Sequence, residues 1–192
     1  MALIYETELK KQIREKNMSN CYLFYGDESY LKQFYSEKIC STFVTKGSET
    51  FCLRKYDGKE NTIDDVLEGA SSMPFMSEYS VVIARDFPLD SLNASDSEKL
   101  NSFLENLPDT SITVFRMDGI EVQPRNSKWK QVVEKFTKYA TVVNFEKPKG
   151  RELIKLLCAY SQKQGCPMNE NTASYLVELC GDGLNVLFNE IQ

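Results

Sequence analysis

The residues best placed for chemistry are two adjacent carboxylates in a short loop near the N-terminus. The loop follows the apolar run 21–25 and precedes a helical pattern, and it consists of Gly26, Asp27, Glu28 and Ser29. In a nucleotide-binding α/β domain, this first strand–loop–helix junction holds phosphates with several glycines, a lysine and a Ser or Thr. Here one glycine is accompanied by two negative charges, which repel phosphate. We therefore predict a degenerate nucleotide loop that binds no nucleotide.

Few other side chains in the sequence could take part in catalysis or bind a metal ion. The sequence has no histidine, which removes the commonest general base and every Ser-His or Cys-His nucleophile pair. Its six cysteines form no C-x-x-C pair, so we predict no metal site, and we expect Cys21 and Cys52 to be buried, reduced thiols. Asp86 stands after an apolar strand pattern, but it has no phosphate loop with which to share a metal ion. We predict no catalytic residue and no cofactor.

Composition excludes several classes of protein. The formal net charge of −5 argues against a nonspecific nucleic-acid binder, whose affinity comes from neutralising phosphates. No apolar run approaches the roughly 20 residues of a membrane span, and the N-terminal residues do not follow the pattern of a signal peptide. A hydrophobic content of 42% is enough for a packed core. We expect a cytoplasmic protein without membrane contact.

Strand and helix patterns, which must position this loop, alternate along residues 1–146. Five short apolar or β-branched runs are typical of buried parallel strands: 21–25, 50–56, 79–85, 111–116 and 140–145. Helical patterns precede or separate them at 6–17, from 28 onward, and at 62–72, 96–106 and 127–138. This alternation predicts an α/β domain with a doubly wound, parallel, five-stranded sheet.

The pattern changes after Phe145. The stretch 146–150 contains Pro148 and Gly150, and only helical patterns follow, at 151–164, 170–180 and from 184 onward. We therefore predict a second, three-helix domain over 147–192. Because its third helix is short, we expect the sequence to be a fragment of a longer chain.

Two surface features remain as candidate binding sites. The segment Met73, Pro74, Phe75 and Met76 places three large apolar side chains beside a proline that ends a helix. Adaptable Met and bulky Phe suit a partner's pocket, although such side chains can also cover the edge of a sheet. The second feature is a basic cluster at the domain junction, consisting of Lys147, Lys149, Arg151 and Lys155. It could contact DNA phosphates or a neighbouring subunit, or form an ordinary solvated face.

Four segments carry a resemblance to a known family. YLFYGDESYLKQ, KYDGKE, MPFMSEYSVVIARD and GDGLNVLFNEI, in this order and spacing, resemble the delta subunit of the bacterial DNA polymerase III clamp loader. The resemblance implies an AAA+-like α/β domain with a small helical lid domain and, in the whole protein, a helical collar domain that is absent here. It also implies a non-catalytic member of a five-subunit ring within a DNA polymerase holoenzyme. Such a subunit binds and opens the sliding clamp, while neighbouring subunits bind ATP.

The resemblance further implies partners and a contact site. The partners are the sliding clamp, the other AAA+ subunits of the loader and, within the complex, DNA. The family's apolar contact pair falls on Phe75 and Met76, flanked by Met73 and Pro74, although the family usually has Leu followed by Phe at this pair. Two alternatives stay open. One is a degenerate P-loop-like enzyme, and the other is the bracing delta-prime subunit, whose zinc-ligand cysteines and Ser-Arg-Cys motif are missing from this sequence.

Overall fold

A computed structural model describes residues 3–75 and 77–192, so Met76 of the predicted contact segment lies outside the described residues. The chain divides into two compact units, Met1–Phe145 and Glu146–Gln192.

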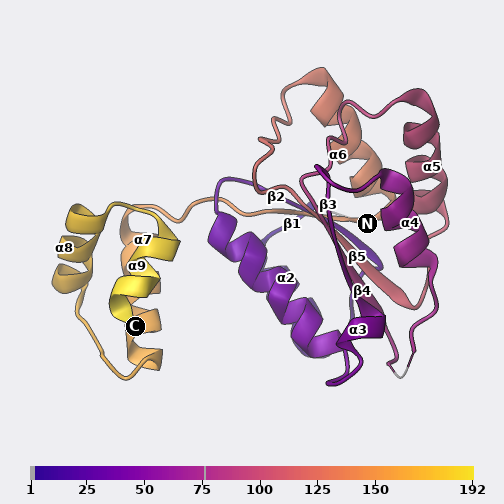
Figure 1. Cartoon of the computed structure of the whole chain (residues 1–192). Coiled ribbons are helices and arrows are strands. Elements are labelled where there is room, and N and C mark those ends of the chain that lie inside the picture. Colours follow the sequence, from indigo (N-terminus) through magenta and orange to yellow (C-terminus); the bar gives the residue numbers. More distant parts are fainter. Residues whose placement is uncertain (1–2, 76) are drawn as a thin grey trace. The chain divides into compact units, whose positions relative to one another are not determined.

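The first unit is built on a parallel sheet, which Figure 1 shows with helices around it. In the described part of the chain the sheet has six strands in the order β1-β6-β2-β5-β4-β3. They are β1 (Leu3–Ile4), β2 (Cys21–Tyr25), β3 (Leu53–Asp57), β4 (Ser80–Arg85), β5 (Ser111–Arg116) and β6 (Thr141–Asn144). The predicted parallel α/β sheet is confirmed, with one strand more than expected. The additional strand, β1, has two residues and pairs with β6 at the sheet edge.

The predicted strand over 50–56 begins too early. Residues Glu49–Cys52 form a short helix, α3, and strand β3 starts only at Leu53. The helical turn closes because the backbone N–H groups of Phe51 and Cys52 both donate to the carbonyl of Ser48, at 2.9 Å each. Phe51 therefore lies in this helical turn at the surface and not in the sheet.

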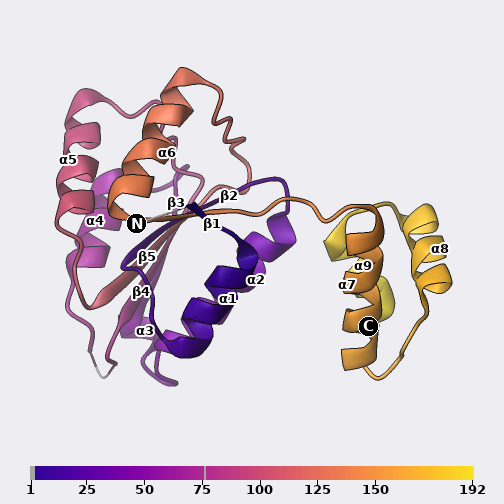
Figure 2. The same ribbon diagram turned by 180° about the vertical axis from the view of Figure 1, so that it is seen from behind.

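Helices cover both faces of the sheet, as Figures 1 and 2 show. Helices α1 (Glu6–Glu15) and α2 (Ser29–Phe43) lie on one face, and α4 (Ile63–Ser71), α5 (Ala94–Glu105) and α6 (Ser127–Tyr139) lie on the other. Helix α4 begins at a capping box, in which the Thr62 side chain accepts from the Asp65 N–H and the Asp65 carboxylate accepts from the Thr62 N–H. All five residues of β2 are buried, as expected for a strand with helices above and below.

The second unit consists of α7 (Gly150–Lys163), α8 (Glu170–Cys180) and α9 (Leu184–Ile191). The rings of Tyr160 and Phe188 stack with centroids 3.9 Å apart, which fixes α7 against α9. The side chains that form its small core are Leu153, Leu157, Ala173, Leu184, Leu187, Phe188 and Ile191.

None of the helices in the described ranges has the length and apolar character needed to span a membrane. Both cysteines expected to be buried, Cys21 and Cys52, are free and buried, which confirms that prediction.

Candidate functional site

The loop between β2 and α2 is packed against the protein's own chain. Gly26 has a φ of +110°, and a Cβ atom at this position would lie 2.4 Å from the carbonyl oxygen of Phe145. The same carbonyl accepts the backbone N–H of Glu28 at 3.1 Å. The single glycine of the loop is therefore required for close approach to the end of β6.

The carboxylate of Glu28 caps the helix that follows. Glu28 is buried, and its Oε1 accepts the backbone N–H of Tyr30 at 3.1 Å. In phosphate-binding loops, the free N–H groups of the first helical turn face the anion. Here an internal carboxylate accepts one of them. The other two residues of the predicted loop, Asp27 and Ser29, are exposed.

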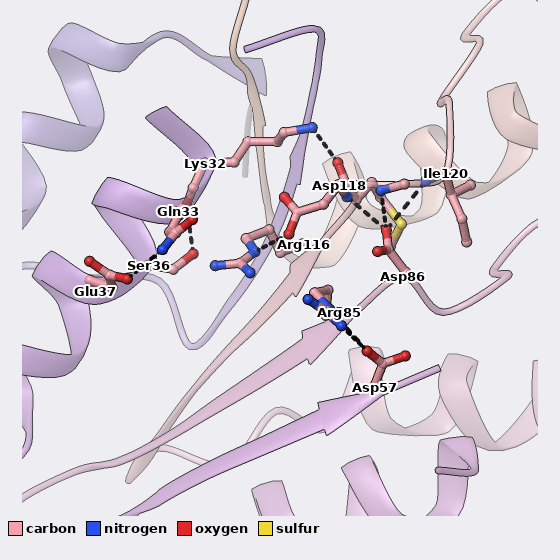
Figure 3. A network of polar contacts seen from close by, with 12 residues as sticks. Lys32, Gln33, Ser36, Glu37, Asp57, Arg85, Asp86, Arg116, Asp118 and Ile120 are labelled. Carbon is pink, nitrogen blue, oxygen red and sulfur yellow. Dashed lines mark hydrogen bonds and ion pairs between the residues drawn. The ribbon is translucent and has the colours of Figure 1, made fainter. Parts of the chain in front are cut away.

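A buried lysine that sequence reasoning missed completes this loop. Lys32 of α2 donates from Nζ to the carbonyl oxygen of Gly26 at 2.8 Å and to that of Met117. Figure 3 shows its side chain reaching across the ends of the strands. Burial lowers the pKa of Lys32, and the nearby carboxylates of Asp118 and Asp86 oppose that shift. The missed signal is spacing, since Lys32 stands six residues after Gly26, as the lysine does after the first glycine of G-x-x-x-x-G-K.

Asp86 fastens two neighbouring strand ends to each other. It has a φ of +54°, and its Oδ1 accepts the backbone N–H groups of Asp118 at 2.7 Å, Gly119 at 2.8 Å and Ile120 at 3.3 Å (Figure 3). The end of β4 is thereby tied to the loop that follows β5. Among residues 3–75 and 77–192, no group of three or more His, Cys, Asp or Glu side chains is placed to hold a metal ion.

The charged side chains at this edge of the sheet neutralise one another. Nε of Arg116 lies 2.8 Å from Oδ2 of Asp118. Burial raises the pKa of Asp118, and the positive charges of Arg116 and Lys32 oppose that shift. On the neighbouring strands, Nε of Arg85 donates to Oδ2 of Asp57 at 3.0 Å (Figure 3). Ion pairs thus stand at the ends of β3, β4 and β5.

A pocket of about 610 Å³ lies between α2 and strands β3 and β4. Its lining includes Ser36 and Cys40 from α2 and Leu53 and Ile83 from the strands. It also includes charged side chains of both signs, which are Glu37, Lys46, Glu49, Lys55, Asp57, Glu60, Arg85 and Arg116. The volume falls within the range of small-molecule sites, but the lining favours neither anions nor cations.

The predicted contact segment lies between α4 and β4 and is exposed where it is described. Met73 is 85% exposed and Phe75 is 60% exposed, while Pro74 is partly buried. Neither Met73 nor Phe75 is therefore a buried core side chain. Both large apolar side chains are thus open to solvent.

The predicted basic cluster lies at the start of the second unit. Nζ of Lys147 is 3.2 Å from Oδ1 of Asp182, so this lysine is in an ion pair. Lys149, Arg151 and Lys155 are exposed, and the last two stand on successive turns of α7. Three of the four predicted residues thus present positive charge to the solvent.

The strand order and the two-sided helical cover, with a small helical unit after them in the chain, make an AAA+-like fold. A family model described as DNA polymerase III, delta subunit matches residues 22–146. The chain therefore belongs to the DNA polymerase III delta subunit family.

Individual relatives agree with this assignment. The DNA polymerase III subunit delta of Bacillus subtilis is 23% identical over 189 residues, covering 95% of this chain and 53% of the relative. The solved structure of the B. subtilis DNA clamp loader delta protein has a TM-score of 0.73 at 21% identity, covering 97% of this chain and 56% of that one. The chain thus spans about half the length of these relatives.

More distant structures share the fold alone. A DNA polymerase III gamma subunit-related protein from Thermotoga maritima has a TM-score of 0.59 at 11% identity, covering 95% of this chain and 57% of its own. The RuvB Holliday junction branch migration motor from the same organism has a TM-score of 0.57 at 11% identity, covering 97% of this chain and 60% of its own.

Proposed function

We propose that this chain is part of the clamp-loader subunit that binds the DNA polymerase sliding clamp and opens it for loading onto DNA, without binding ATP. The observation that carries the proposal is the exposure of Met73 and Phe75 in a member of the delta subunit family. These residues stand where the family's apolar contact is expected, and that segment also includes Pro74 and Met76.

The chemistry of the contact is the burial of apolar side chains in a pocket of the clamp. Phe75 supplies a rigid aromatic anchor, and Met73 supplies a flexible side chain that adapts to the shape around it. Opening the ring requires a difference in affinity. The subunit must bind the clamp more tightly when one clamp interface is open, since a ligand shifts an equilibrium only by its differential affinity for the two states.

The contacts of the degenerate loop support the absence of ATP binding. A nucleotide would need the space beside Gly26 that the Phe145 carbonyl occupies, and the N–H group that the Glu28 carboxylate accepts. It would also need the ammonium group of Lys32, which is bound to two carbonyl oxygens of the chain. The space is thus occupied, and both the N–H group and the ammonium group are bound to acceptors within the protein.

We predict that calorimetric titration of the chain with Mg-ATP shows no binding in the micromolar range. The physical reason is that binding must break the internal contacts of Glu28 and Lys32 and place phosphates beside two carboxylates. A dissociation constant near 1 μM, equivalent to about −8 kcal/mol, would contradict the proposal.

Further partners follow from the proposed role. The other AAA+ subunits of the loader bind ATP and assemble with this one in the cytoplasm, within the polymerase holoenzyme. The exposed side chains of Lys149, Arg151 and Lys155 can contact DNA phosphates or a neighbouring subunit in that assembly. Lys147 contributes less, because its charge is paired with Asp182.

A degenerate P-loop-like enzyme is the second candidate function, and the pocket between α2 and β3–β4 is the observation that favours it. Two contacts disfavour it. Of the three carboxylates that such an enzyme would use, Glu28 caps α2 and Asp86 accepts three backbone N–H groups, whereas Asp27 is exposed. Turnover of any nucleotide by the purified chain would favour this candidate over the clamp-loader role.

A further inference from the structure

A second phenylalanine stands beside the proposed clamp contact. Phe51 belongs to α3, the helical turn that precedes β3, and it is 53% exposed. Its ring centroid lies 5.5 Å from that of Phe75, and the two ring planes meet at 67°. The edge of one ring therefore faces the other, a favourable geometry for an aromatic pair. The two side chains come from segments that are well separated in the sequence, on either side of β3 and α4.

The backbone around Phe75 is fixed to the same helix. The thiol of Cys52, the residue after Phe51, donates to the carbonyl oxygen of Phe75 at 3.0 Å. Cys52 itself is fully buried, so this contact anchors the segment to the body of the domain. On the other side of the segment, the hydroxyl of Ser77 donates to the carbonyl of Phe43 at 3.2 Å. The Phe75 carbonyl is thus held by Cys52, and Ser77, two residues further on, is held by α2.

The contact between the two rings reduces the side-chain entropy that Phe75 loses on binding. An exposed aromatic side chain loses rotamer freedom when it enters a pocket, and that loss weakens binding. Because Phe51 restricts the Phe75 ring before any partner arrives, part of the loss has already occurred. Phe51 also extends the apolar surface around Phe75, and residues that surround an anchor exclude water from it.

We propose that Phe51 is part of the clamp-docking surface and acts as one unit with Phe75. This inference rests on the proposed function, because its partner is the sliding clamp. The expected recognition feature is an apolar depression of the clamp that is wide enough for a pair of aromatic rings rather than for a single side chain. The contact between the two rings makes the surface continuous.

The test is to titrate the organism's own purified sliding clamp into the 192-residue chain and into single and double variants. Phe51→Ala is expected to weaken binding about five- to tenfold. In a Phe75→Ala background, the same change is expected to weaken binding no more than about twofold further, since residues in contact are not additive. Tyr175→Ala is the matched control, because Tyr175 is 61% exposed and lies on α8, in the other unit. It is expected to leave binding unchanged.

The outcomes separate this inference from the proposed function. If the unaltered chain does not bind the clamp, the proposed function fails. If it binds and Phe75→Ala weakens binding, but Phe51→Ala binds within about twofold of the unaltered chain, only the inference fails. Fully additive losses for the two changes would also overturn it, because they would show two independent contacts. Thermal unfolding of each variant checks that its fold is intact.

Discussion

Phe75→Ala is expected to weaken binding of the sliding clamp by about thirtyfold or more. An aromatic anchor that fills a partner's pocket contributes at least ~2 kcal/mol to binding, which corresponds to that factor. The 60% exposure of Phe75 means that most of its surface is available for such a contact. The measurement is a titration of the clamp into the variant and into the unaltered chain under the same salt concentration.

Thermal unfolding is the control for this variant. Because Phe75 is exposed, its truncation should remove only the ring contact with Phe51, worth about 1 kcal/mol, and the melting temperature should fall by only a few degrees. A buried phenylalanine would cost about 3–5 kcal/mol on the same substitution. Unchanged clamp affinity together with a large fall in melting temperature would show that the interaction site is placed wrongly.

Asp86→Ala is expected to lower the free energy of unfolding by about 3 kcal/mol or more. The change leaves three backbone N–H groups, those of Asp118, Gly119 and Ile120, without their acceptor, and hydrogen bonds to charged groups contribute about 1.5–3 kcal/mol each. Alanine also tolerates the φ of +54° poorly. In a chain of this size the melting temperature should fall by roughly 6–12 °C.

The matched control for this position is Asp86→Asn. Asparagine keeps an acceptor oxygen for the three N–H groups and tolerates a positive φ better than alanine. Chemical denaturation of the two variants should therefore show a loss for asparagine less than half that for alanine. Equal losses would mean that the negative charge, rather than the acceptor geometry, holds the loop after β5 in place.

Much of the fold follows from local patterns. The runs 21–25 and 111–116 are continuous and apolar, which is typical of strands covered on both faces, and both coincide with observed strands. The start of α4 follows from Thr62 and the carboxylates after it, because their side chains satisfy the free N–H groups of the first turn.

Other features depend on contacts that local patterns do not contain. The run 50–56 has an apolar character that suits a strand and a helical turn equally, and the turn at α3 forms because Ser48 accepts two N–H groups. The two residues of β1 are too few to give any periodic signal. A strand that short is recognisable only through its pairing with β6.

The candidate site also has features that the sequence predicts and features that depend on tertiary contacts. The absence of a glycine-rich phosphate loop is visible in the sequence, but the internal partners of Glu28 and Lys32 come from the tertiary structure. The apolar composition around Phe75 is likewise visible, whereas its exposure depends on where α4 ends and on how Cys52 holds the segment. Periodicity assigns residues to faces of elements, and Phe75 stands outside any element.

The most direct test of the proposed role is a titration of the organism's purified sliding clamp into this chain, first without nucleotide and then with Mg-ATP. We predict saturable binding without nucleotide and the same dissociation constant when Mg-ATP is present, since the proposed contact segment, Met73, Pro74, Phe75 and Met76, is separate from the loop at 26–29. A folded chain that fails to bind the clamp under either condition, or that binds it only when Mg-ATP is present, would contradict the account.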